Sequence, residues 1–275
     1  MIYILQKRRI KNIYLLILLT LLISLIFPSC SHKSNSKVRI PVRYDLIGYK
    51  YSFGKPDTSG IIKEKVFFNA NGKDSIKILF DESGIQKSKT LFNYDSLGNI
   101  CQSITYNAFG EVKTKSSYEY DNKGLILSSK EDDADGGYHY QTYYYNNGKL
   151  IRKHWQANYN MSSEWTKADE VVYLDYDIKD RLIAERYCDN NKVSYVFYYK
   201  NDSLGRQIEM SIQSNTRKYK YDNNGNITEE ISLSGDGKQA WRWVRKYNTQ
   251  KVLIEEITFN SLNEPIELQK KIIYF

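Results

Sequence analysis

Residues that build metal centres and catalytic sites are scarce in this sequence. Its 275 residues include only three cysteines and three histidines. They form no C-x-x-C pair and no Cys/His cluster, so the sequence does not support a zinc site. A G-x-S-x-G elbow, a phosphate-cradling loop and an H-E-x-x-H helix are also missing. We therefore predict that the protein is not an enzyme and carries neither a metal nor a cofactor.

The acidic residues do not form a ready catalytic or calcium site either. Two Glu-Glu pairs stand at 229–230 and 255–256, but neighbours on a strand point to opposite faces. A carboxylate pair assembled from distant strands would not be visible in the sequence. The stretch "EDDADG" from Glu131 is similar to the start of a calcium loop, yet Thr142 stands where the bidentate glutamate is needed. An acidic hairpin turn is the better interpretation.

The cysteines and histidines of the mature chain have ordinary structural interpretations. Cys101 and Cys188 could pair outside the cytoplasm, but nothing in the sequence fixes their distance, and buried small apolar residues are the favoured interpretation. His139 and His154 flank Gly148 and are expected on neighbouring strands. No cysteine or carboxylate joins them at ligand spacing, so we expect solvent-facing side chains.

Residues 1–29 differ from the rest of the chain and indicate export. A basic start, Lys7 to Lys11, precedes fifteen mostly apolar residues, and Ser29 precedes Cys30. This layout resembles a bacterial lipoprotein signal, which implies cleavage before Cys30, lipidation of that cysteine, and a polar tether over residues 30–37. An uncleaved anchor and simple secretion are the alternatives. All three place the chain in the cell envelope or beyond it, and the first predicts a membrane-anchored protein.

Positive charge is too thinly spread to indicate a nucleic-acid partner. The full chain carries a net charge of +8, but four of its 40 basic residues lie in the first 29 positions. The remaining 36 basic residues face 32 acidic ones and form no basic run. Nucleic-acid binding needs a concentrated basic face, so we expect no nucleic-acid partner.

One short unit repeats along the chain. It reads as an aromatic residue, then Asp or Asn, then usually Gly, then an apolar residue. Clear copies are "YDSLGNI" from Tyr94, "YDNKGLI" from Tyr120 and "YDNNGNI" from Tyr221. Asp and Asn bond their own backbone, and Gly accepts a positive φ, so each unit predicts a hairpin turn between strands.

The spacing of the turns predicts the topology. A clear or weaker turn comes every 10 to 14 residues, which is close to one strand plus one tight turn. We therefore predict an all-β fold over residues 38–275, an antiparallel β-meander of some sixteen strands curling into an extended twisted or spiral sheet. Its edges would self-associate unless the segments "VRIPVRYDL" and "KKIIYF" cap them.

The repeat resembles the YD repeats of Rhs-type and wall-associated bacterial proteins over roughly residues 66–265. That resemblance implies a spiralling β-sheet, which in large family members forms a shell around a toxic C-terminal domain. After its last turn this chain has about a dozen residues, too few for such a domain.

The aromatic residues are the best candidates for a binding surface. The sequence has 25 tyrosines and four tryptophans. Trp155, Tyr159 and Trp165 lie in "WQANYNMSSEW", which we interpret as a long loop, and Trp241 and Trp243 alternate onto one strand face. For the tyrosines as a class, cross-strand aromatic packing is the favoured interpretation.

These observations predict a non-enzymatic, lipid-anchored envelope protein that presents a tyrosine-rich sheet to a polysaccharide or an envelope protein. Two alternatives stay open. The chain could be a short Rhs-like shell or spacer protein acting with a partner chain, or an envelope hydrolase with an unrecognised carboxylate dyad.

Overall fold

The computed structural model describes residues 40–161 and 164–275, and every regular element within them is a β-strand. The predicted signal peptide, the lipidation of Cys30 and the polar tether lie outside the described residues. Within the described part of the chain, no helix is long and apolar enough to cross a membrane.

Nineteen strands, rich in Tyr and Ile as strand propensities favour, follow one another. They are β1 (Arg43–Ser52), β2 (Lys55–Pro56), β3 (Ile61–Phe68), β4 (Asp74–Phe80), β5 (Gln86–Tyr94), β6 (Ile100–Asn107), β7 (Val112–Tyr120), β8 (Ile126–Asp133), β9 (Tyr138–Asn146), β10 (Lys149–Met161), β11 (Glu164–Tyr176), β12 (Leu182–Asp189), β13 (Lys192–Asn201), β14 (Gln207–Ile212), β15 (Asn215–Tyr221), β16 (Ile227–Leu233), β17 (Gln239–Tyr247), β18 (Leu253–Phe259) and β19 (Pro265–Tyr274).

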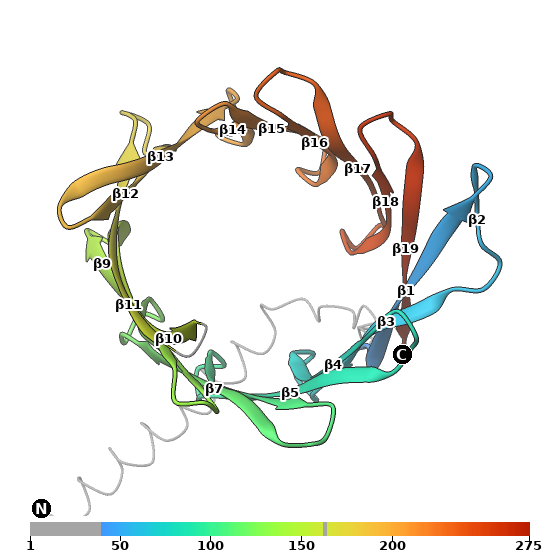
Figure 1. Cartoon of the computed structure of the whole chain (residues 1–275), viewed down its shortest axis with the longest axis horizontal. Helices are drawn as coiled ribbons and strands as arrows, with labels where there is room; N and C mark the ends of the chain where they lie inside the picture. Colours follow the sequence, from blue (N-terminus) through green and yellow to red (C-terminus); the bar gives the residue numbers. More distant parts are fainter. Residues whose placement is uncertain (1–39, 162–163) are drawn as a thin grey trace, which may run out of the picture. The chain divides into compact units, whose positions relative to one another are not determined.

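The antiparallel meander was predicted correctly, but the spiral sheet was wrong, because the strands close into a barrel. From β3 to β19 each strand pairs with the next, and β1 pairs with both β3 and β19. Arg43, for example, lies opposite Tyr274 on one side and Phe67 on the other. An 18-strand ring results, with β2 attached only to the end of β1 (Figure 1).

The two segments that we considered as caps therefore form the seam of the barrel. β1 begins within "VRIPVRYDL" and β19 ends within "KKIIYF", and both lie inside residues 40–275. Ring closure leaves no unpaired edge along the ring, which removes the expected reason for self-association. Residues 40–275 also form one compact unit by themselves.

The repeated Asp or Asn builds the turns in the predicted way. In the turn after β15, the Oδ1 atom of Asp222 accepts the backbone N–H groups of Asn224 and Asn226 at 2.9 and 2.8 Å, and Gly225 has a φ of +83°. In other turns too, the side-chain Oδ1 atom of the first residue accepts the backbone N–H group of the residue four positions later. The accepting residues are Asn69, Asp81, Asp95, Asn107, Asp121, Asp177, Asp202, Asn248 and Asn260.

The repeated tyrosine joins neighbouring hairpins at one end of the barrel. Its hydroxyl donates to a backbone carbonyl at the start of a strand in the preceding hairpin. These bonds are Tyr94 to Asp74, Tyr120 to Ile100, Tyr176 to Leu150, Tyr221 to Gln207 and Tyr247 to Ile227, at 2.6, 3.0, 2.7, 2.6 and 2.9 Å. All five tyrosines end odd-numbered strands. We call this end the tyrosine rim, and its turns span 69–73, 95–99, 121–125, 146–149, 177–181, 202–206, 222–226 and 248–252.

Alternate side chains of each strand face the lumen or the outside. On β7, Ser116 and Tyr118 are buried or half-buried, whereas Lys115, Ser117 and Glu119 are exposed. Side chains crowd on a concave wall, so the less exposed set faces the lumen. The wall is a single layer, and of the described hydrophobic side chains only seven are buried.

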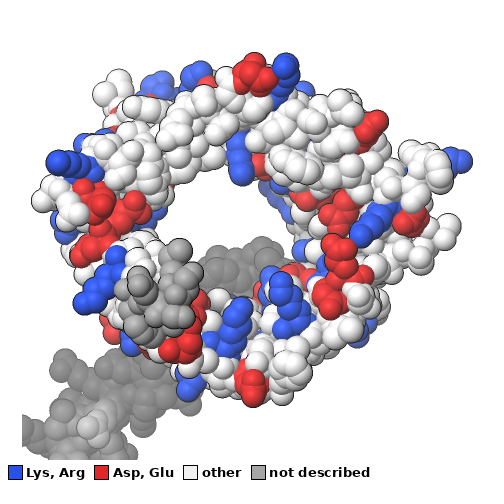
Figure 2. Space-filling view, viewed as in Figure 1, with Lys and Arg blue, Asp and Glu red and all other residues white. Residues whose placement is uncertain are grey.

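The barrel encloses an open lumen. A ring of 18 strands, spaced about 4.8 Å apart and tilted by about 40°, has a backbone diameter of roughly 35 Å. Figure 2 shows an opening through the space-filling surface with basic and acidic side chains around its mouth. The fold therefore presents its inner wall to anything that enters the lumen.

Candidate functional site

Three aromatic rings stack in a row on the inner wall. Trp155 and Tyr159 lie four residues apart on β10 and face the same side as Ala157. His139 of β9 lies directly opposite Ala157. Because the Ala157 side chain is small and buried, the imidazole fits between the two larger rings. Its ring centre lies 6.0 Å from that of Trp155 and 6.3 Å from that of Tyr159, at interplanar angles of 25° and 10°. We call this row the aromatic platform.

Polar side chains surround the platform. A cavity of about 200 Å³ beside it is lined by Ser116, Tyr118, Ser129, Lys130, Glu131, His139, Tyr140, Gln141 and Trp155. Ser116 donates a hydrogen bond of 2.9 Å to Glu131. A second cavity of about 430 Å³ lies at the Tyr159 end, with Asp133 and Asp135 in its lining. The site thus combines flat apolar faces with carboxylate, amide and hydroxyl groups.

Carboxylates continue along the inner wall next to the platform. Glu170 of β11 lies opposite Trp155, and burial raises the pKa of its carboxyl group. Glu185 of β12 is bonded to Lys153 at 3.1 Å and to the hydroxyl of Tyr199 at 3.3 Å. Among the described residues of this arc, Glu131 and Glu170 form no ion pair, whereas Lys153 is paired with Glu185. The arc therefore suits a neutral or cationic ligand better than an anionic one.

The other predicted tryptophans lie elsewhere on the barrel. Trp241 and Trp243 share the inner face of β17, where Trp243 lies between Glu230 and Thr258. Six strands separate β17 from β10 along the shorter way round the ring. The nearby carboxylates are neutralised, since Arg245 bonds Glu256 at 2.6 Å and Glu230 at 3.0 Å, and Arg217 also bonds Glu230 at 3.1 Å. β17 and β10 therefore face one lumen but do not form one site.

The long loop predicted between Trp155 and Trp165 is wrong. The segment instead forms the ends of β10 and β11, and these two strands of 13 residues each are the longest in the described part of the chain. Alternating apolar and polar residues extend the pairing to Met161 and Glu164. Trp165 pairs through its backbone with Asn160, while its side chain lies outside the described residues.

The histidines and cysteines occupy separate places. His139 and His154 lie on neighbouring strands as predicted, but His139 faces the lumen whereas His154 bonds Asp169 on the outer wall. Cys101 and Cys188 are unpaired, and Cys188 is buried. In the described ranges no group of three or more metal-ligating side chains comes together. Residues 133–137 form the expected acidic hairpin turn.

No pattern in the sequence indicated that His139 would join the site. Its position depends on the pairing of β9 with β10 and on the small residue opposite it. The two adjacent Glu-Glu pairs behave as predicted. Glu229 bonds Arg242 on the outer wall, whereas Glu230 bonds Arg245 on the inner wall.

The outer wall is charged. The outward side chains of β7 include Lys115 and Glu119, and those of β15 include Lys218 and Lys220, and all four are exposed. Strands that cross a bilayer carry an apolar outer band about 25 Å tall. The outward side chains of β7 and β15 therefore do not form such an apolar band.

No protein-family model and no curated protein matches the sequence. Among solved structures, a porin-like protein from Bacteroides uniformis is similar at 12% identity over 86% of this chain and 98% of its own, with a TM-score of 0.43. A porin-like protein from Bacteroides vulgatus is similar at 13% identity over 59% of this chain and 94% of its own, with a TM-score of 0.36. A TcdB2-TccC3 structure is similar at 13% identity over 73% of this chain but 14% of its own, with a TM-score of 0.21. Similarities this weak do not assign the chain to a family.

Proposed function

We propose that this chain is a non-enzymatic cell-envelope protein, lipid-anchored through Cys30, whose barrel binds an extended glycan on its inner wall. The aromatic platform of Trp155, His139 and Tyr159 carries the proposal. Sugar rings present apolar C–H faces and polar edges, and they stack on flat aromatic side chains that stand beside hydrogen-bonding groups.

Neighbouring polar groups would set the orientation of the sugar. Glu131, Ser116 and Gln141 line the cavity next to Trp155 and supply acceptors and donors for sugar hydroxyls. A lumen open to solvent would let a polymer lie across several strands. The acidic surroundings favour a neutral or amino-sugar polymer over an acidic polysaccharide.

A direct test uses tryptophan fluorescence of residues 31–275 against a panel of neutral, basic and acidic polysaccharides. His139→Ala dismantles the stack but keeps every tryptophan as a reporter. We expect one neutral or basic class to quench the wild-type emission, and His139→Ala to weaken its binding by about tenfold.

His154→Ala is the matched control, because it removes the same side chain from the outer wall of the neighbouring strand. It should bind as the wild type does. A panel without any response, or equal losses in the two variants, would refute the glycan proposal.

The open lumen also favours a second candidate, a shell or spacer protein of the Rhs type that surrounds a partner chain. Such a protein would form a stable complex with one envelope protein and would not respond to sugars. Crosslinking in intact cells would identify that partner. We consider a hydrolase a weaker candidate because the carboxylates Glu230 and Glu256 are both held by Arg245.

A further inference from the structure

The two rims of the barrel differ strongly in charge. Turns of the tyrosine rim contain seven basic and six acidic residues, a net charge of +1. We call the opposite end the acidic rim, and its turns span 53–60, 81–85, 107–111, 133–137, 189–192, 213–214, 234–238 and 260–264. These turns contain three basic and nine acidic residues, a net charge of −6. A negatively charged surface would therefore repel the acidic rim far more than the tyrosine rim.

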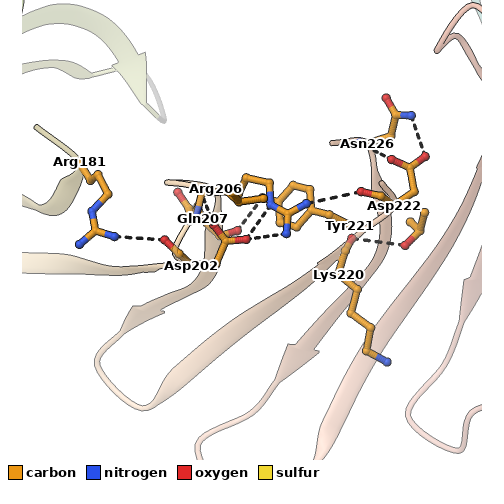
Figure 3. Close-up of polar contacts among 10 residues, drawn as sticks. Arg181, Asp202, Arg206, Gln207, Lys220, Tyr221, Asp222 and Asn226 are labelled. Carbon is orange, nitrogen blue, oxygen red and sulfur yellow. Dashed lines mark hydrogen bonds and ion pairs between the residues drawn. The ribbon is translucent and has the colours of Figure 1, made fainter. Parts of the chain in front are cut away.

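On the tyrosine rim, several aspartates are bonded within the rim. Asp202 accepts from the Arg206 guanidinium at 2.6 Å, and its backbone carbonyl accepts from Arg181 at 3.1 Å (Figure 3). Asp222 is held in the same way by the backbone and side chain of Asn226. By contrast, Lys123 and Lys179 stand exposed at the tips of their turns. Asp180 is exposed as well, but it is ion-paired with Lys149, so the exposed charges at these two tips that form no ion pair among the described residues are basic.

Apolar side chains project from the same turns. Ile178 is fully exposed, Leu204 is 76% exposed and Leu97 is 70% exposed. Each lies at the tip of a turn whose backbone is fixed by the aspartate bonds described above. These exposed apolar tips lie on rigid turns near the basic residues Lys73, Lys179 and Arg206, and they are well suited to entering the headgroup region of a bilayer.

The N-terminal segment leads to this rim. β1 starts at Arg43, opposite Tyr274 and Phe67, and the neighbouring turn 69–73 belongs to the tyrosine rim. Nine residues, 31–39, separate the predicted lipid on Cys30 from the first described residue. A fully extended chain of that length spans at most about 30 Å. Lipidation at Cys30 would thus attach the chain to the membrane from the tyrosine-rim end of the barrel.

We propose that the tyrosine rim docks on an anionic phospholipid bilayer, with Leu97, Ile178 and Leu204 inserted at the interface and the barrel axis upright. The acidic rim then faces away from the membrane, and the lumen opens toward the lipid at one end. This inference goes beyond the proposed function, because it concerns a surface outside the lumen.

Vesicle co-sedimentation of residues 31–275, which contain the complete strand ring, tests the inference without the lipid anchor. The vesicles consist of equal parts phosphatidylcholine and phosphatidylglycerol. We expect the chain to bind, and the triple variant Leu97→Asp, Ile178→Asp, Leu204→Asp to bind at least about tenfold more weakly, because the carboxylates remove the apolar insertion and are repelled by the anionic surface.

The acidic rim offers a matched control variant. Ile85, Phe109 and Leu262 are likewise exposed at turn tips there. The triple variant Ile85→Asp, Phe109→Asp, Leu262→Asp should bind vesicles as the wild type does, provided that thermal melts show both variants folded. Absence of wild-type binding, or equal losses in the two triple variants, would overturn the inference. His139→Ala should leave vesicle binding unchanged, which separates this result from a failure of the glycan proposal.

Discussion

The five tyrosine hydroxyls that join neighbouring hairpins predict a measurable and additive loss of stability. Replacing Tyr94, Tyr120, Tyr176, Tyr221 and Tyr247 by phenylalanine removes one hydrogen bond each and leaves the ring in place. A net hydrogen bond contributes about 0.5–1.5 kcal/mol. Because these tyrosines are only half-buried, water can reach the vacated carbonyls, and we expect the lower half of that range, about 0.5–1 kcal/mol each.

The five tyrosines lie two or four strands apart along the ring, which is about 10 Å or more, so their effects should add. The variant that carries all five Tyr→Phe substitutions should then lose about 2.5–5 kcal/mol of a total stability of about 5–15 kcal/mol. With an m-value of about 3 kcal/mol per M of urea, the unfolding midpoint would fall by roughly 0.8–1.7 M. Urea titration followed by far-UV circular dichroism measures this shift.

Tyr198→Phe is the control, because Tyr198 is 59% exposed on the outer wall and lies outside the repeat. It should shift the midpoint by less than about 0.2 M. If the variant with all five substitutions were as stable as the wild type, the hydrogen bonds of the repeat tyrosines would not stabilise the barrel. A Tyr198→Phe loss equal to that of Tyr120→Phe would lead to the same conclusion.

Three further predictions concern pH and turn geometry. Burial raises the pKa of Tyr187 from 10.0 to about 12, so its contribution to stability is complete below pH 10 and lost as the pH rises through 12; melting temperatures across this range should fall. Bonds from Arg181 lower the pKa of Asp177 from 3.8 to about 2. The stability that Asp177 adds is therefore present above its unfolded pKa and lost as the pH falls toward 2. In Asp177→Asn the melting temperature should depend less on pH over this acidic range. Gly225 has a φ of +83°, so its replacement by alanine should lower the free energy of unfolding by about 1–2 kcal/mol. Urea titration should detect that loss.

Local structure followed from the sequence to a large extent. The unit of aromatic residue, Asp or Asn, and Gly specifies its turn through bonds to its own backbone, so the turns after Tyr94, Tyr120 and Tyr221 could be placed without knowledge of distant contacts. The weaker turns within the doubled gaps were also placed correctly, as the positive φ of Asn190 and Gln213 shows. Period-two alternation then placed strands between them.

The tertiary structure decided the closure of the ring and the composition of the site. Whether a meander stays open or closes depends on the pairing of β1 with β19, more than 200 residues apart, and no local pattern encodes that pairing. The same holds for the aromatic platform. Trp155 and Tyr159 were visible as candidates, but His139 joined them through cross-strand register, and Trp243 was separated from them by its place in the ring. The sequence by itself determined turns, strands and their alternation, because these depend on neighbours in the chain. Register across the seam and the choice of lumen-facing partners depend on the whole closed sheet, and only the tertiary structure could decide them.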